Sequence, residues 1–335
     1  MDSNLNKEQS LKNIKMISIT GGTGHLGINL IQAFLEQKFL VKALIRHSSF
    51  PLNHPNLTWV EGDLNNLQVL SRLTDESDAL IHCASAISLG EIDNESIYEV
   101  NVTGTQNLLN ACLDKPIRFA YISSSTAVED PLDDEVFDEN RPYRSDKSFY
   151  YAWTKAQGER EVLQRVKNND LDAYILRPTA IVGPEDPGPS RFGRTILDIH
   201  MGKLPFITDG GYNMVDVRDL SQTIINSLLR AKKGSVYLTG GEYISLKKLA
   251  KIAHPTKTPL LLPLTLLIGL LPLIDLYDRF FKLKWPVNRE SLNALKYAPK
   301  HMNSSKAVKE LGHTNRALEN SIEDLLRWFT KNKTT

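Results

Sequence analysis

Residues 20–27 read TGGTGHLG, and this glycine-rich stretch decides the fold of the chain. It follows an isoleucine-rich run at 14–20 and precedes residues 26–37, whose apolar side chains recur at helical spacing. A dinucleotide pyrophosphate needs this order of strand, glycine turn and helix, because glycines leave room at the turn and the first helix amides face the anion. The predicted phosphate cradle consists of Gly21, Gly22, Thr23, Gly24, His25, Leu26 and Gly27.

Strand-like and helical segments alternate along the rest of the chain. Further strands are expected at 39–46, near 57, at 78–85, at 117–125, near 171 and near 235. Alternation of this kind predicts right-handed crossovers and a parallel sheet covered on both faces. The expected fold is therefore α/β, a Rossmann-type doubly wound parallel sheet with a smaller C-terminal substrate-binding lobe.

The character of the sequence changes beyond Gly183, where residues 184–190 form a proline-rich loop. We expect a dinucleotide-binding core at 14–185 and 215–240, and a substrate-binding lobe at 186–214 and 241–331.

The end of the second expected strand bears on which nucleotide binds. Arg46 stands about 20 residues past the glycines, where an NAD-preferring site carries an acidic residue for the ribose 2′-hydroxyl. A guanidinium suits a 2′-phosphate instead, so NADP(H) is favoured and NAD(H) is the alternative. Further donors and adenine contacts are expected at His47, Ser48, Ser49, Asp63 and Leu64. A solvated arginine at Arg46 and a plain surface acid at Asp63 are the competing interpretations.

The chemistry is expected at the fifth strand and the helix that follows it. Strand 117–125 ends in three serines, and ligands of open parallel sheets bind at the carboxyl ends of strands, where Ser125 falls. Tyr151 and Lys155 are four residues apart in the helical stretch 150–167, so they share a face. An ammonium beside the phenol lowers its pKa from about 10, which makes it a usable acid/base.

The trio of glycine turn, serine and Tyr-x-x-x-Lys resembles the extended short-chain dehydrogenase/reductases, and the likeness runs from about residue 14 to 330. The resemblance implies that Ser125 holds the substrate oxygen, that Tyr151 is the acid/base, and that Lys155 also binds the nicotinamide ribose. Asn101, in NVTGT, would support the proton relay. Further cofactor contacts implied by the resemblance are Ala84, Ser85 and, in LRPTAIVGP, Pro178 after Arg177.

Substrate-facing positions are expected at Ser125, Thr126 and Arg191. Arg191 and Arg194 follow the proline-rich loop and could clamp a phosphate or carboxylate, or be ordinary surface arginines. The stretch GKLPFITDGGYNMVDVRDL, 202–220, resembles dihydroflavonol reductases and their bacterial relatives. The family that the chain resembles also includes 3β-hydroxysteroid dehydrogenases, and the likeness is greatest to these two kinds of member.

The sequence thus favours an NADP(H)-dependent oxidoreductase that interconverts a ketone and a secondary alcohol on a largely apolar small molecule. Two alternatives stay open, namely a nucleotide-sugar epimerase that retains NAD and a non-catalytic NADP-binding redox sensor.

Composition is that of an ordinary globular chain. The 335 residues carry 40 basic and 39 acidic side chains, a formal net charge of +1, which gives no reason to expect nucleic acid as a partner. The two cysteines, Cys83 and Cys112, lack metal-ligand spacing, so we expect free thiols, no metal and a reducing compartment. The polar N-terminal dozen lacks a signal-peptide core, which predicts a cytoplasmic location. Relatives often pair through the helices that bear the tyrosine, which allows a homodimer.

Residues 260–274 read LLLPLTLLIGLLPLI and are almost wholly apolar. Fifteen residues with two internal prolines fall short of the roughly 20 that a spanning helix needs, so no transmembrane span is predicted. Three interpretations remain: a helix packed in the lobe, a wall over an apolar substrate, or a peripheral contact with a membrane or a partner protein. In the third, Lys282, Lys284 and Arg289 would contact anionic lipid headgroups. We expect an apolar pocket wall formed partly here.

Overall fold

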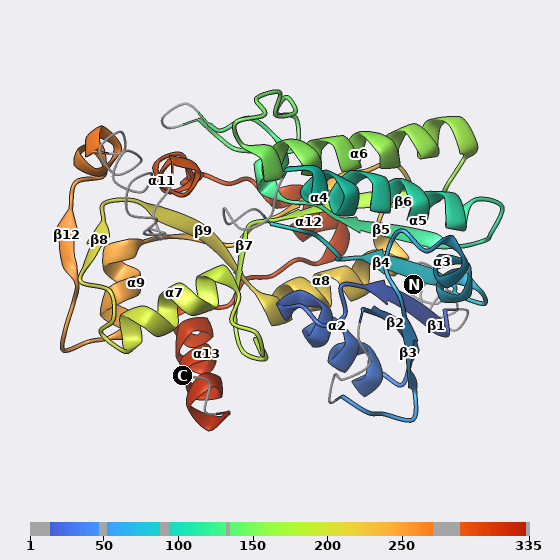
Figure 1. Ribbon diagram of the computed structural model, residues 1–335, viewed down its shortest axis with the longest axis horizontal. Helices are drawn as coiled ribbons and strands as arrows, with labels where there is room; N and C mark the ends of the chain where they lie inside the picture. The colour runs from blue at the N-terminus through green and yellow to red at the C-terminus, as the bar shows by residue number, and fades with distance from the viewer. Residues whose placement is uncertain (1–13, 47–51, 88–93, 132–134, 271–288, 333–335) are drawn as a thin grey trace.

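The computed structural model describes residues 14–46, 52–87, 94–131, 135–270 and 289–332 (Figure 1). Seven strands, all parallel to their neighbours, form the central sheet in the order β10-β6-β5-β4-β1-β2-β3. Their bounds are β1 Met16–Thr20, β2 Leu40–Ile45, β3 Leu57–Glu61, β4 Ala79–His82, β5 Arg118–Ile122, β6 Ala173–Pro178 and β10 Val236–Thr239. The strand order reverses between β1 and β4, which creates the switch point where such sheets bind ligands. The doubly wound parallel sheet predicted from the sequence is confirmed.

Helices cover both faces of this sheet, because its strands are apolar on both sides (Figure 1). On one face lie α2 (His25–Glu36), α8 (Val217–Arg230) and α12 (Ser305–Leu311). On the other lie α3 (Leu67–Thr74), α5 (Gly104–Cys112) and α6 (Tyr150–Asn169). Each face has its own buried cluster, and strands β5 and β6 contribute to both.

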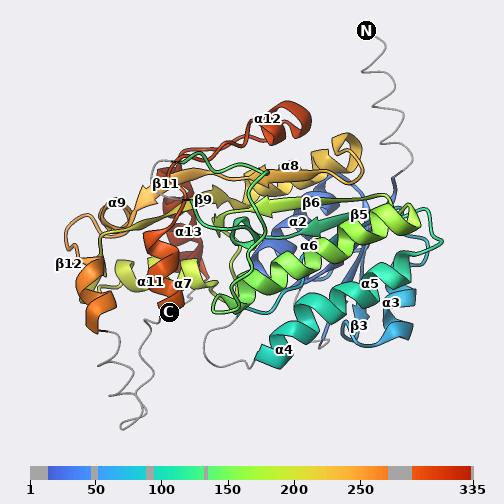
Figure 2. The same cartoon turned by 90° about the horizontal axis from the view of Figure 1, so that it is seen from above.

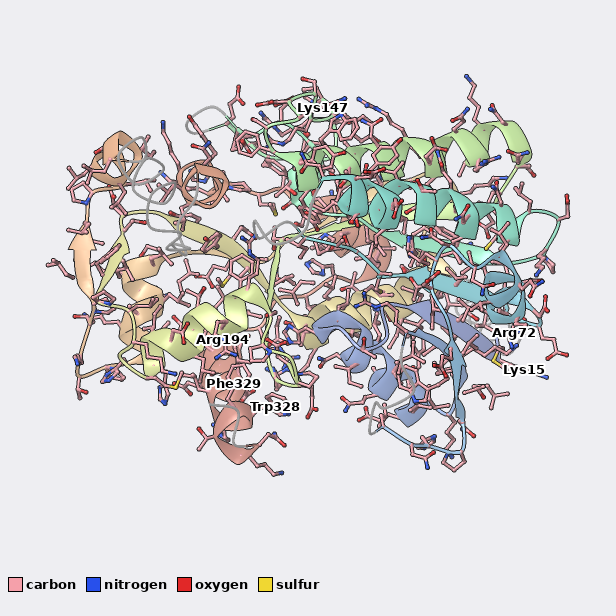
Figure 3. The ribbon with its side chains drawn as sticks, viewed as in Figure 1. Lys15, Arg72, Lys147, Arg194, Trp328 and Phe329 are labelled. Atoms are coloured by element: carbon pink, nitrogen blue, oxygen red, sulfur yellow. The ribbon has the colours of Figure 1, made fainter. Side chains whose placement is uncertain are left out.

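A second hydrophobic core lies beside the parallel sheet, around buried side chains such as Ile196, Ile322 and Phe329. Its strands are β7 (Ala180–Val182), β9 (Gly211–Asp216) and β11 (Glu242–Ser245) in one sheet, and β8 (Phe206–Thr208) and β12 (Leu260–Leu262) in another. Its helices are α7 (Arg191–His200), α9 (Leu246–Ala253), α11 (Arg289–Lys296) and α13 (Leu318–Lys331), and Figure 3 marks Phe329 on α13. We propose two domains on the basis of this separate core. Two elements depart from the bounds given above: α12, expected in the lobe, packs on the parallel sheet, and β7, expected in the dinucleotide-binding core, belongs to the sheet of the second core.

The structure corrects one element next to the site. The apolar spacing of residues 97–113 predicts one continuous helix, but the chain forms α4 (Asn94–Tyr98), a π-helical segment η1 (Glu99–Thr103) and then α5. The Gly104 amide donates to the Glu99 carbonyl five residues earlier, which is the π-type hydrogen bond. Periodicity cannot reveal such an insertion, because the apolar spacing changes by only one residue.

The apolar stretch at 260–274 is only partly a helix. Residues 260–262 form β12, which pairs with β8, and residues 264–270 are helical, while residues 271–274 lie outside the described part. Leu264 and Leu267 are buried in the second core, whereas Leu260 is exposed. Among the described residues no helix is long and apolar enough to cross a membrane.

Candidate functional site

The glycine turn between β1 and α2 is built as a cradle. Gly21 has φ +73°, a conformation that favours glycine, and a Cβ on Gly27 would lie 2.1 Å from the Gly21 carbonyl oxygen. Gly24 caps α2 without any side-chain hydrogen bond, which leaves the first amides of the helix facing outward. A Cβ on Gly24 would meet only the Gly21 oxygen, at an ordinary 3.4 Å. Among the described residues no contact therefore demands glycine at Gly24, whereas a closely bound pyrophosphate would.

The other residues of the turn have different surroundings. Thr23 is exposed, and Leu26 is buried in the core beneath α2. His25 Nε2 lies 3.1 Å from the Pro184 carbonyl oxygen, and Asn29 donates to the same oxygen at 3.2 Å. These bonds tie the start of α2 to the loop that follows β7.

The predicted nucleotide contacts line the carboxyl edge of the sheet. Arg46 follows β2 directly and is exposed, and the neighbouring candidates at 47–49 lie outside the described residues. Asp63 follows β3, is exposed, and accepts from the Asn65 amide at 2.8 Å. Leu64 is buried against Gly104, where a Cβ would come within 2.8 Å of the leucine side chain.

The end of β4 abuts the glycine turn. A Cβ on Gly21 would lie 2.7 Å from the Ala84 amide nitrogen, and that amide donates to Thr20 at 3.3 Å. Ser85 is exposed and donates to the Asn101 side-chain oxygen at 3.0 Å. Two of the predicted contacts, Ala84 and Ser85, therefore lie between the cradle and the π-helical segment.

The proton-transfer candidates meet at the end of β5. Lys155 Nζ donates to the Ile122 carbonyl at 2.7 Å and lies 4.6 Å from the centre of the Tyr121 ring. Tyr151 is half-buried one turn before Lys155. Burial, then the charges of Glu159 and Tyr151, raises the pKa of Tyr121 at this strand end. Ser125 begins the short 3₁₀ turn η2 (Ser125–Ala127), which packs on α6, and is 9% exposed.

Lys155 is held in an unusual electrostatic environment, since it is only 2% exposed. Burial lowers its pKa to about 8, and the nearby Glu159 and Cys83 oppose that shift. At pH 7 the amine therefore still carries its proton.

Asn101 and His82 belong to a buried polar network that sequence reasoning did not find. Asn101 donates to the Ala86 carbonyl at 2.9 Å and to Thr154 at 3.0 Å. The Asn101 carbonyl accepts from Thr105 at 2.8 Å, and the Thr105 hydroxyl lies 3.0 Å from His82 Nε2. Burial, and secondarily the charge of Lys155, lowers the pKa of His82 to about 3, so the imidazole is neutral.

The Arg177 guanidinium is paired inside the protein. It forms a buried ion pair with Glu159 of α6, with nitrogen–oxygen distances of 2.7, 2.9 and 3.2 Å. Glu159 is fully buried and Arg177 is 2% exposed. The pair fixes α6 against β6 one turn beyond Lys155. The next residue, Pro178, is buried at the end of β6. The spacing Tyr151, Lys155, Glu159 along one helix face could have revealed this carboxylate.

Arg144 joins the serine turn to the tyrosine helix, and no local sequence signal marks it. Its Nε donates to the Thr126 carbonyl at 3.1 Å, a terminal nitrogen donates to the Val128 carbonyl at 3.2 Å, and its amide donates to the Ala127 carbonyl at 3.0 Å. The guanidinium stacks 4.6 Å over Phe149, the N-cap residue of α6, and is 3% exposed. The structure thereby couples η2 with the start of α6.

The remaining substrate candidates are solvent-facing. Thr126 is exposed, and its hydroxyl lies 2.8 Å from that of Ser124. Arg191 and Arg194 are exposed on the first turns of α7, where Figure 3 labels Arg194. Figure 3 also labels Lys147, which lies in the loop before α6. Within the described ranges, no group of three or more His, Cys, Asp or Glu side chains could hold a metal.

Polar atoms without partners at the carboxyl edge of the sheet also fit a nucleotide. Within the described structure, His25 Nδ1, Ser123 Oγ and Thr179 Oγ1 are buried and make no hydrogen bond. They lie at the start of α2, just after β5 and just after β6, respectively. Because buried polar groups are nearly always bonded in folded proteins, these atoms suit a bound molecule with its own donors and acceptors.

Comparisons with known proteins agree with this architecture. Residues 17–240 match the model of the NAD dependent epimerase/dehydratase family. A protein of Synechocystis sp. named "Putative dihydroflavonol 4-reductase" is 33% identical over 93% of both chains. The sterol demethylase protein B of Methylococcus capsulatus is 29% identical over 93% of this chain and 97% of its own. The crystal structure of gox2253 has a TM-score of 0.83 and 29% identity, over 95% of this chain and 98% of that one.

Proposed function

The chain belongs to the NAD dependent epimerase/dehydratase family, the extended short-chain dehydrogenase/reductases, and we propose that it is an NADP(H)-dependent oxidoreductase. The proposed reaction interconverts a ketone and a secondary alcohol on a largely apolar small molecule. The observation that carries the proposal is the position of Lys155, whose buried ammonium bonds the end of β5 one turn from Tyr151.

In this reaction the nicotinamide would supply or accept the hydride, and the protein would handle the proton. We propose that Tyr151 gives a proton to the carbonyl oxygen during reduction and takes it back during oxidation. The Lys155 ammonium favours the phenolate that remains, because opposite charges attract strongly at a buried site. Ser125 would hold the same substrate oxygen, and Asn101 would order the groups behind Lys155.

The glycine turn is the proposed seat of the pyrophosphate, with the outward-facing amides of α2 as donors. Ala84, Ser85 and Pro178 would border the ribose and nicotinamide, and Asp63 and Leu64 the adenine. Arg46 is the proposed partner of a 2′-phosphate. Replacing Arg46 with alanine should weaken NADPH binding while leaving NADH binding nearly unchanged, which titration calorimetry would measure.

The names of the similar full-length proteins support a reductase or dehydrogenase and suggest ring-shaped substrates. Dihydroflavonols, sterols and steroids therefore belong in a panel of candidate carbonyl substrates, with sugar nucleotides to test the epimerase alternative. We expect NADPH oxidation with an apolar ring substrate. A mass spectrum that finds tightly retained NAD on the purified protein, together with turnover of sugar nucleotides, would favour the epimerase.

The proposal has a matched pair of variants in adjacent residues. Tyr151→Phe should lower turnover at least about a hundredfold, the lower end for a positioned acid/base, while NADPH affinity stays within a few-fold. Tyr150→Phe should leave turnover unchanged, because only Tyr151 has Lys155 one turn later. Equal turnover by both variants and the unmodified protein would refute the assignment. NADPH binding without turnover of any carbonyl substrate would favour the redox sensor.

A further inference from the structure

The end of the molecule formed by β12 carries exposed leucines. Leu260 and Leu261 of β12 are 66% and 42% exposed, and Leu266 and Leu270 of the following helical turns are 50% and 38% exposed. Figures 1 and 2 both place β12 at the extremity of the molecule that lies away from the parallel sheet. Large apolar side chains gathered in this way mark a surface that contacts something apolar.

These leucines are not misplaced core residues. Leu264 and Leu267 of the same segment are already buried in the second core. β12 is paired with β8 from Leu260 to Leu262, and the Leu264 amide donates to Asp209. The segment is therefore anchored to the lobe by one set of residues while a different set faces outward.

A basic hollow adjoins the leucines. It is lined by Lys203, Leu204 and Pro205 before β8, and by Lys257 and Pro259 before β12. Both lysines are exposed, and residues 251–270 contain no acidic side chain. The Leu260 amide donates to the Pro205 carbonyl at 3.1 Å, so the hollow lies directly at the start of the exposed strand.

We propose that this face, Leu260, Leu261, Leu266 and Leu270 with Lys203 and Lys257, docks on an anionic lipid surface. Leucines can enter the acyl boundary of a bilayer while lysines beside them reach the lipid phosphates, which is the chemistry of peripheral membrane contact. The lack of acidic side chains in residues 251–270 removes a source of repulsion from such a surface.

The shape of the face favours a bilayer over a second copy of the chain. Neighbouring residues of a strand point to opposite sides, so the exposure of both Leu260 and Leu261 wraps the apolar surface around the strand edge. A fluid lipid surface accepts such a projecting edge, whereas a protein partner needs a complementary groove. Docking of this kind needs no spanning helix, in agreement with the described helices.

Sedimentation with sucrose-loaded vesicles tests the proposal on the 335-residue chain. We expect binding to phosphatidylcholine mixed with phosphatidylglycerol, weaker binding to phosphatidylcholine alone, and loss of binding in high salt. The double variant Leu260→Ser, Leu266→Ser should bind at least about tenfold more weakly, because each leucine loses its apolar contact. Lys203→Glu and Lys257→Glu should each weaken binding about fivefold or more on the anionic vesicles only.

Matched controls come from α12, where Val308 is 50% exposed and Lys309 is exposed. Val308→Ser and Lys309→Glu should bind vesicles like the unmodified protein. As a control for an intact fold, all variants should keep the melting temperature and the NADPH affinity of the unmodified protein.

Three results would overturn the proposal. The first is an absence of sedimentation with anionic vesicles, and the second is binding that the leucine and lysine variants leave unchanged. The third combines two observations: light scattering detects a dimer that the double variant Leu260→Ser, Leu266→Ser abolishes, and the unmodified protein does not bind vesicles. That result would assign the face to contact with a second copy of the chain.

Discussion

Replacement of Lys155 by methionine tests the electrostatics of the site without any substrate. The lysine is 2% exposed, and burial lowers its pKa from 10.5 to about 8. Below pH 8 the amine is charged in both the folded and unfolded chain, and folding bears the cost of burying that charge. Between pH 8 and 10.5 the folded protein loses the proton first, so this cost disappears as the pH rises.

The magnitude follows from the two pKa values. A folded pKa of about 8 and an unfolded pKa of 10.5 give a free-energy cost of burying the charge that falls by about 1 kcal/mol between pH 7 and pH 9. The free energy of unfolding of the unmodified protein should therefore rise by about that amount relative to Lys155→Met. Groups shared by both proteins, such as the Cys83 thiol, whose pKa burial raises to about 12, largely cancel in the difference.

Urea unfolding at pH 7, 8 and 9, followed by fluorescence and circular dichroism together, supplies the measurement. Lys309→Met, at an exposed position on α12, is the control and should show no such pH-dependent difference. A difference between the unmodified protein and Lys155→Met that stays flat from pH 7 to pH 9 would show that Lys155 is not desolvated. The account of how Lys155 acts on Tyr151 would then fail.

Three further substitutions probe how the site is built. Gly27→Ala should prevent stable folding, because its Cβ would lie 2.1 Å from the Gly21 carbonyl oxygen. Gly24→Ala should fold with little change in melting temperature but bind NADPH at least about tenfold more weakly in a fluorescence titration. Glu159→Gln should lower the free energy of unfolding by about 3–5 kcal/mol, because it leaves the buried Arg177 charge without its carboxylate partner. A loss under about 1 kcal/mol in urea unfolding would contradict the ion pair. Arg144→Ala should reduce kcat more than NADPH affinity, and Arg144→Lys should recover part of the kcat. An unchanged kcat in Arg144→Ala would show that η2 and α6 are not coupled through this residue.

Much of the fold could be predicted because each of its elements has a local signature. The seven parallel strands were expected from apolar runs, and the crossovers from the handedness of such connections. The glycine turn was predicted from a motif whose physical requirements are confined to eight residues. The helix of Tyr151 and Lys155 was expected at 150–167 and runs from Tyr150 to Asn169. Local patterns succeed here because backbone propensity and side-chain periodicity act over a few residues.

The supports of the site had no such signature. Arg144 lies 18 residues from Thr126 and acts through a loop whose path the sequence does not specify. Arg177 matches a strand motif, and helical spacing places Glu159 on the face of Lys155, but only the packing of α6 across β6 shows that the two residues pair. The π-helical segment that carries Asn101 ends at Gly104, which packs closely on Leu64, and no apolar pattern in the sequence reports either feature.

The sequence by itself determined the order of strands and helices, the position of the glycine cradle, and the helical spacing of Tyr151 and Lys155. These features depend on local sterics and periodicity, which the order of residues specifies directly. Only the tertiary structure decided the low pKa of Lys155, the neutral state of His82 and the outward-facing leucines of β12. Those properties depend on which groups lose contact with water, and desolvation is set by packing between segments far apart in the chain.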